Sequence, residues 1–81
     1  MQKEIYINED IIKYLEKRQL IKQYEKVEKF LKKWNFRQVD LRLREPKKDK
    51  IYYFKINKQF RLWCKMEWNK IFVFEIDNHQ N

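Results

Sequence analysis

Apolar residues recur along this chain with two different periods, and the change of period divides it into two parts. Between residues 9 and 34 they fall three or four positions apart, which predicts amphipathic helices over about 9–17 and 20–34. Asn8 is a good N-cap for the first helix, whose first turn is acidic. The short link KRQ between the helices predicts an antiparallel helical hairpin.

Oily and polar residues alternate in the second part of the chain, a pattern typical of β-strands. The alternating stretches are VDLRLR, IYYFKI, FRLWCKM and IFVFEI, with a turn around Pro46–Asp49 after the first. The stretch EIYI, at residues 4–7, predicts a further short strand ahead of the helices. The expected fold class is therefore α+β: a short N-terminal strand, then a two-helix hairpin packed on one face of a three- to four-stranded antiparallel sheet.

The alternation also predicts how the strands pair. A loop at 57–59 pairs Lys55 with Arg61, and a turn centred on Trp68 pairs Arg61 with Glu75. Two-residue loops at these places would set core residues opposite charged ones, so we expect neither. Leu62 then lies opposite Phe74, and the face turned to the core consists of Tyr52, Phe54, Ile56, Phe60, Leu62, Cys64, Met66, Phe72, Phe74 and Ile76.

The opposite face of the sheet combines charges with aromatic rings. Because the helices cover only the apolar face, we expect this one to be open. Such a face suits a nucleic-acid strand, since phosphates meet cations and bases stack on rings. An ordinary cross-strand ion pair between Arg61 and Glu75 explains the charges equally well. The expected rows are Lys55–Arg61–Glu75 and Tyr53–Trp63–Val73, joined by Arg42 and Arg44 from the strand before.

Length and composition narrow the class of protein. The 81 residues, 43% of them hydrophobic, predict one small domain over 1–81. No apolar run approaches the ~20 residues of a membrane span, so we expect a cytoplasmic protein without a membrane partner. One cysteine, Cys64, cannot form an internal disulfide, and with a single histidine it cannot build a structural zinc site. We therefore expect neither a metal nor a cofactor.

The formal charge of +8 is concentrated in one region. Clustered cations favour a polyanionic partner, because each phosphate contact releases counterions. A solvated, lysine-rich surface is the alternative interpretation. Between residues 42 and 61 the basic residues are Arg42, Arg44, Lys47, Lys48, Lys50, Lys55, Lys58 and Arg61, against Glu45 and Asp49.

One stretch of the chain contains, in this order, a basic strand, a turn, an aromatic–Arg pair, an apolar strand and a closing strand that ends near a histidine. Its sequence is YYFKINKQFRLWCKMEWNKIFVFEIDNH. In this order and spacing the chain resembles the RelE/ParE superfamily of type II toxins, above all its RelE- and HigB-like members, over nearly its whole length. The resemblance implies a ribosome-dependent endonuclease that cleaves mRNA in the decoding site and is neutralised by a cognate antitoxin. In ParE-like relatives the same fold acts on DNA gyrase instead.

The resemblance also implies a set of site residues. Arg61 matches the family's most recurrent site arginine, which contacts the scissile phosphate, and Lys55 matches a basic residue of the preceding strand. His79 falls where many members have a histidine or tyrosine. Asp77 and Asn78 lie where HigB-like members have site residues. Tyr53 stands where some members have another lysine, so the general base stays open.

Cleaving RNA through its own 2′-OH needs a base for that proton, a cation on the phosphate and an acid for the leaving oxygen. Glu75 or His79 could be the base, Arg61 the cation, and Lys55 or His79 the acid. A gyrase inhibitor, or a non-catalytic RNA-binding module on the same fold, is the alternative, and His79 could be a plain surface residue. The expected RNA-binding residues are Arg42, Arg44, Lys48, Lys50, Tyr53, Lys58, Trp63 and Asn78.

Overall fold

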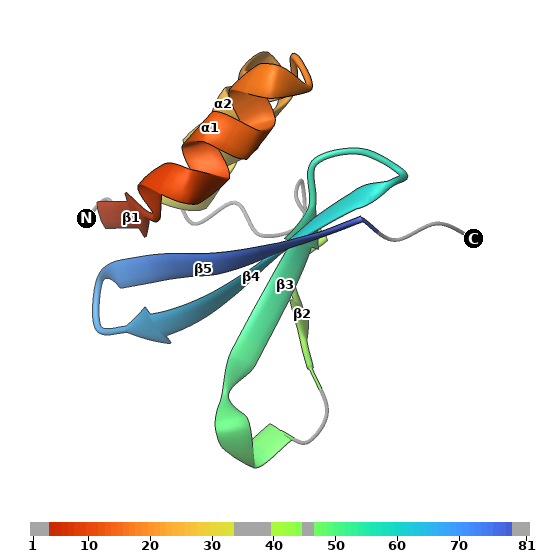
Figure 1. Cartoon of the computed structure of the whole chain (residues 1–81). Helices are drawn as coiled ribbons and strands as arrows, with labels where there is room; N and C mark the ends of the chain where they lie inside the picture. Colours follow the sequence, from red (N-terminus) through yellow and green to blue (C-terminus); the bar gives the residue numbers. More distant parts are fainter. Residues whose placement is uncertain (1–3, 34–39, 45–46, 79–81) are drawn as a thin grey trace.

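The computed structural model describes residues 4–33, 40–44 and 47–78. Over these residues the fold is α+β, as expected, with helices packed on one face of a sheet (Figure 1). The elements in chain order are β1 (Glu4–Ile7), α1 (Glu9–Lys17), α2 (Ile21–Lys32), β2 (Arg42–Leu43), a short 3₁₀ helix η1 (Lys47–Asp49), β3 (Ile51–Lys55), β4 (Phe60–Glu67) and β5 (Lys70–Asn78).

Helices α1 and α2 form the hairpin that the sequence predicts. Helix α1 has the predicted bounds, and the Asn8 side chain caps it by accepting a hydrogen bond from the Asp10 backbone N–H at 2.8 Å. Gln19 then takes a left-handed φ of 56°, and the chain turns back so that α2 runs antiparallel to α1 (Figure 1). Helix α2 is shorter than predicted and ends at Lys32, while Trp34 lies outside the described residues.

The sheet contains more strands than the sequence predicts. Over the described residues it has five, in the order β1-β5-β4-β3-β2. Strand β1 pairs with β5 in parallel, Ile5 opposite Ile71, whereas the other neighbours are antiparallel. The expectation of three or four antiparallel strands was therefore incomplete, because a parallel partner so distant in the chain has no local signal. Strand β2 is shorter than the VDLRLR stretch, whose Val39 lies outside the described residues.

The pairing of β4 with β5 differs from the prediction. Trp68 and Asn69 form a two-residue turn, so Glu67 faces Lys70. Continued unbroken, this register would set Leu62 opposite Glu75, and that conflict was our reason for expecting no such turn. A β-bulge resolves the conflict by adding one residue to β5 opposite the Trp63–Cys64 step, and beyond it Leu62 faces Ile76. The predicted pairs Leu62–Phe74, Arg61–Glu75 and Trp63–Val73 are thus wrong; the observed partners are Ile76, Asp77 and Glu75.

The two-residue turn and the bulge together decide which residues of β5 enter the core. Ile71 and Val73 are buried there, whereas Phe74 is 42% exposed and Phe72 is only half-buried. The prediction that Phe72 and Phe74 face the core is wrong for this reason. The predicted inward residues of 52–64 that are buried do pack against helix side chains in one cluster: Ile11, Leu15, Leu20, Tyr24 and Leu31 with Phe54, Ile56, Phe60, Leu62 and Cys64. Ile51 of β3 is also buried but lies outside this cluster.

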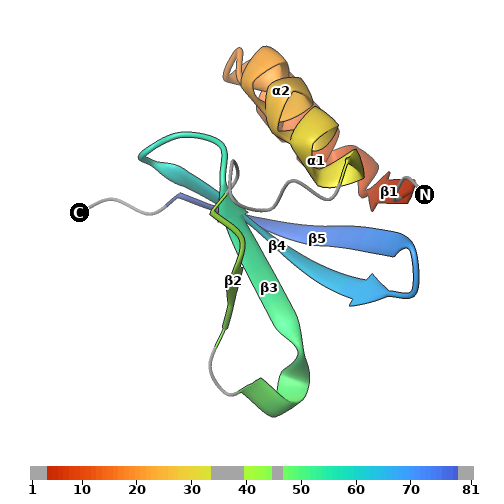
Figure 2. The same cartoon turned by 180° about the vertical axis from the view of Figure 1, so that it is seen from behind.

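The helices leave the other face of the sheet uncovered. Figures 1 and 2 show α1 and α2 on one side of the strongly twisted sheet, while the β2–β3 end with η1 projects away from them. Among the described residues no helix packs on that second face, which we call the open face. Within the same residues no helix is long and apolar enough to cross a membrane.

Candidate nucleic-acid interface

The strand register arranges the residues of the open face in rows. The first row contains Lys55, Arg61 and Asp77, from β3, β4 and β5. The predicted neighbours Lys55 and Arg61 therefore do lie opposite each other. Asp77 takes the place in this row that was predicted for Glu75. The second row is Arg42, Tyr53, Trp63 and Glu75, and the third contains Arg44, Ile51, Lys65, Phe72 and Tyr6.

Arg61 is held in place from three sides. Its Nη2 donates a hydrogen bond to Oδ2 of Asp77 at 2.7 Å, within an ion pair. Its guanidinium lies 5.1 Å from the ring centroid of Trp63 and 5.3 Å from that of Tyr53, which is cation–π distance. The side chain is 20% exposed. These contacts fix the guanidinium without removing it from reach of a ligand, because only one of its donor groups is used.

Arg44 approaches the same tryptophan from the third row. Its guanidinium lies 5.4 Å from the Trp63 ring centroid, and its Nη2 is 3.9 Å from a carboxylate oxygen of Asp49. The rows of Arg44 and Arg61 lie on either side of the row of Trp63, so the two arginines flank its ring. The Nε atoms of both arginines are buried and have no hydrogen-bond partner among the described residues. These buried Nε atoms are out of reach of a ligand, so a ligand on the open face would contact the Nη groups of the two arginines.

This arrangement changes the expected role of the rings. Tyr53 and Trp63 lie side by side, with centroids 5.0 Å apart, and both are half-buried. We expected them to stack on bases, but guanidinium groups occupy much of the space beside them. The centre of the open face therefore presents arginine donors held on an aromatic base, and such donors suit phosphate oxygens.

Each arginine of the open face carries an acidic partner. Arg42 donates from Nε to both carboxylate oxygens of Asp40 at 3.2 Å, and this hydrogen bond, with the charge of Asp40, raises the pKa of Arg42. Arg44 pairs with Asp49 and Arg61 with Asp77. Local charge at the arginines is therefore balanced. The uncompensated cations of the first and third rows are Lys55 and Lys65, both exposed and without an ion pair in the described part of the chain.

The remaining predicted residues are more scattered. Glu75 is exposed and lies opposite Trp63, in the row beside Arg61, not opposite Arg61 as predicted. Asn78 is exposed at the end of β5, opposite Phe60. His79 lies outside the described residues.

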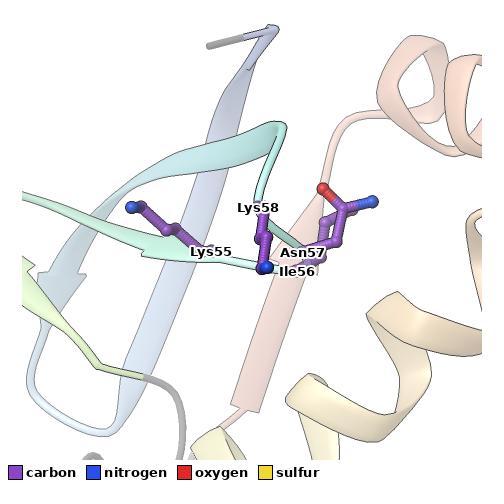
Figure 3. A pocket seen from close by; sticks show the side chains of 4 residues that line it. All are labelled: Lys55, Ile56, Asn57 and Lys58. Atoms are coloured by element: carbon purple, nitrogen blue, oxygen red, sulfur yellow. The ribbon is translucent and has the colours of Figure 1, made fainter. Parts of the chain in front are cut away.

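The loop lysines divide into two places. Lys48 and Lys50 are exposed before the start of β3, whereas Lys58 follows its end. Figure 3 shows Lys58 and Lys55 lining one pocket at the β3–β4 connection, with the Lys55 side chain pointing away from Asn57. Asn57 shapes this connection, because its side-chain oxygen accepts hydrogen bonds from the backbone N–H groups of Gln59 and Phe60, both at 2.8 Å. Only Lys58 of the three is therefore brought beside the row of Arg61.

The contact between Asp77 and Arg61 is the main feature of the first row that was not predicted from the sequence. This pairing depends on the two-residue turn and on the bulge. The turn could have been predicted from the sequence, since Glu67 and Lys70 flank Trp68 and Asn69 as an opposite-charge pair. Within the described residues no three His, Cys, Asp or Glu side chains gather as a metal site would require. No protein-family model matches this chain, and no match is found among curated proteins.

Proposed function

We propose that this protein is a cytoplasmic toxin of RelE type, a metal-independent endoribonuclease that cuts mRNA on the ribosome and is neutralised by a cognate antitoxin. The observation that carries the proposal is the first row of the open face. There Lys55 and Arg61 lie opposite each other, and Arg61 is fixed by Asp77 and two rings. A preorganised cation of this kind is what a phosphate needs as it gains charge during cleavage.

The chemistry follows from the chain's own residues. A base takes the proton of the substrate's 2′-OH, the 2′-oxygen attacks the neighbouring phosphorus, and the bond to the 5′-oxygen breaks. Arg61 stabilises the charge on the phosphorane, and Lys55 protonates the departing 5′-oxygen. Glu75, exposed in the adjacent row, and His79 are the candidates for the base. The products are a 2′,3′-cyclic phosphate and a free 5′-hydroxyl.

Expression without an antitoxin tests this function. We expect growth to arrest within a few generations and transcripts to be cut inside translated frames, which mapping of 5′-hydroxyl ends would detect. Cuts should disappear when translation initiation is blocked, because the proposed substrate is mRNA on the ribosome. Arrest with intact transcripts and altered plasmid supercoiling would instead support a gyrase inhibitor and contradict the proposal.

One observation favours a second candidate, a non-catalytic RNA-binding module on the same fold. The arginines of the open face are each paired with a carboxylate, which positions them for binding but lowers the local positive charge. Such a module would bind RNA with the same face and leave it intact. The transcript mapping separates the two candidates, since only the endonuclease produces new 5′-hydroxyl ends.

A further inference from the structure

The third row of the open face joins cations to aromatic rings across the whole sheet. The Arg44 backbone N–H donates to the Ile51 carbonyl at 2.7 Å, which sets Arg44 beside the start of β3. Ile51 faces Lys65, and Lys65 faces Phe72. Tyr6 completes the row from β1. A ligand lying across the strands along this row would pass from an arginine to a lysine and then to two rings.

The two rings at the β1 end are stacked, with Tyr6 exposed and Phe72 half-buried. The centroids of Tyr6 and Phe72 are 5.4 Å apart with an interplanar angle of 19°, and Tyr6 is 48% exposed. Phe74, also on β5, is 42% exposed. Among the described residues no guanidinium lies over these rings, in contrast to Tyr53 and Trp63. They are therefore the rings of the open face that remain available for stacking.

Their exposure needs an explanation, because an exposed aromatic side chain forgoes burial worth about 1.5–3 kcal/mol for a residue the size of phenylalanine. The bulge and the two-residue turn direct Ile71 and Val73 into the core and leave Phe72 outside. A polar residue at position 72 would satisfy the same register. An exposed ring stacked on a second ring keeps apolar area at the surface, where a flat group of a ligand can cover it.

The charges around the rings indicate which part of a ligand they contact. The Tyr6 hydroxyl donates to Glu4 at 2.9 Å, and Lys70 has its Nζ 6.0 Å from the Tyr6 centroid. Lys70 itself faces Glu67. The β1 end of the open face is thus close to charge balance, which suits an uncharged base and offers little to a phosphate. The cations of the same row, Arg44 and Lys65, suit phosphates.

We propose that Tyr6 and Phe72 form a base-stacking subsite for unpaired nucleotides of a single-stranded RNA whose phosphates lie on Lys65 and Arg44. The inference rests on the proposed function, because that function makes RNA the ligand. It adds the path that the RNA strand takes across the sheet. The RNA crosses the strands from β2 to β1, a width of roughly 19 Å at about 4.8 Å per strand spacing. Every base has a π-face, so this subsite accepts any base and requires only that it be unpaired.

The test compares a single-stranded RNA of about 12 nucleotides, within the usual ~4–16 nucleotide range of single-strand sites, with a duplex of equal length. Both are measured by fluorescence anisotropy against the wild type, Tyr6→Leu and the double variant Tyr6→Leu/Phe72→Leu. Leucine keeps apolar volume and removes the ring. Tyr14→Leu is the matched control, because Tyr14 lies on α1 with Arg18 3.5 Å above its ring, away from the open face.

We expect the double variant to bind the single strand roughly 5- to 100-fold more weakly than the wild type, since stacking on one ring accounts for such factors. Tyr6→Leu, on the sheet edge, should show a smaller loss even if the double variant folds poorly. Duplex binding, and all binding by Tyr14→Leu, should stay within about twofold of wild type. Unchanged single-strand affinity in both ring variants, or an equal loss for duplex, overturns the subsite. Wild-type protein that binds neither RNA also overturns the subsite, whereas the proposed function fails separately, if transcripts stay uncut on expression of the protein.

Discussion

Arg61 is a charged side chain that makes structural contacts on the open face and for which we also propose a role in cleavage. It lies mid-strand in β4, between Phe60 and Leu62, which are buried on the opposite face. Its ion pair with Asp77 joins β4 to β5, and its contacts with rings join the first and second rows of the open face. The core therefore does not depend on Arg61, and truncating it should remove surface contacts alone.

Arg61→Ala and Lys33→Ala should differ in their effect on the rate of cleavage, although each removes one positive charge. Loss of the partly exposed ion pair should cost about 0.2–1 kcal/mol of stability, because Asp77 keeps access to water. Loss of a preorganised charge at the phosphate should slow cleavage roughly 100- to 1,000-fold. Lys33 is exposed after α2, so its removal takes the same formal charge from a distant surface. Rates of cleavage on isolated ribosomes measure the difference. Equal losses in both variants would show that Arg61 acts only through net charge.

Cys64 should make stability depend on pH, because its thiol is fully buried, opposite Val73. Burial raises the pKa of its thiol from 9.0 to about 12. Below pH 9 the thiol is protonated in folded and unfolded chains alike and has no effect on pH dependence. Between about pH 9 and 12 the unfolded thiol ionises first, so stability should fall as pH rises through this range.

Labelling measures the state of Cys64 directly. In native protein at pH 8, a thiol-specific reagent should modify it only at the rate of global unfolding, because the thiol is neutral and inaccessible. In urea above the unfolding midpoint, the same reagent should react at the rate of a free thiol. Stoichiometric modification of the native protein within the dead time would contradict the burial of this residue.

At the scale of elements, the turn between α1 and α2 is closed without glycine. The backbone N–H groups of Gln19 and Leu20 donate to the carbonyls of Glu16 at 3.1 Å and Leu15 at 2.8 Å. This pair of bonds is a Schellman motif, whose left-handed position usually carries glycine. Gln19 occupies it with φ 56° and therefore accepts the strain of a Cβ there.

Gln19→Gly should for this reason stabilise the protein by about 0.5–1 kcal/mol, the strain relieved minus the greater entropy lost by glycine on folding. Urea unfolding followed by circular dichroism gives the value. Gln23→Gly is the matched control: Gln23 is exposed within α2, and the same substitution there should destabilise by about 1 kcal/mol. Destabilisation by both variants would mean that the turn does not need a left-handed residue.

The bulge in β5 is the other decisive local feature. It reconciles a two-residue turn at Trp68 and Asn69 with the burial of Leu62 and Ile76 on one side of the sheet. Its consequence is chemical as well as structural. By shifting β5 one residue it brings Asp77, instead of Ile76, opposite Arg61.

At the scale of the molecule, the net charge of +8 and the row arrangement predict how binding depends on salt. If Arg44, Lys55, Arg61 and Lys65 each contact a phosphate, log K for single-stranded RNA should fall with log salt at a slope of about −3, given ~0.7 per phosphate. Anisotropy titrations between roughly 50 and 300 mM salt measure this slope. Lys33→Ala should leave the slope unchanged. A slope near zero would exclude phosphate contacts as the main source of affinity.

Much of this fold could be predicted from local patterns. The bounds of α1, the N-cap at Asn8 and the inward faces of β3 and β4 follow from periods that act over a few residues. The opposition of Lys55 and Arg61 also follows, because the short connection between β3 and β4 leaves little choice of register. These features depend on interactions between residues close together in the chain.

Tertiary structure alone decided the place of β1 and the partner of Arg61. Strand β1 pairs with β5 across the whole length of the chain, and its position depends on burying Ile5 and Ile7 against the helices and Ile71. The register of β5 depends on a competition between the turn at Trp68 and the burial of apolar residues several positions away. The turn exchanges the faces of Phe72 and Val73 relative to the predicted ones, and a single extra residue beyond them returns Ile76 to the core side. Alternation along one strand cannot reveal it, because both registers have the same period and only packing against the other layer distinguishes them.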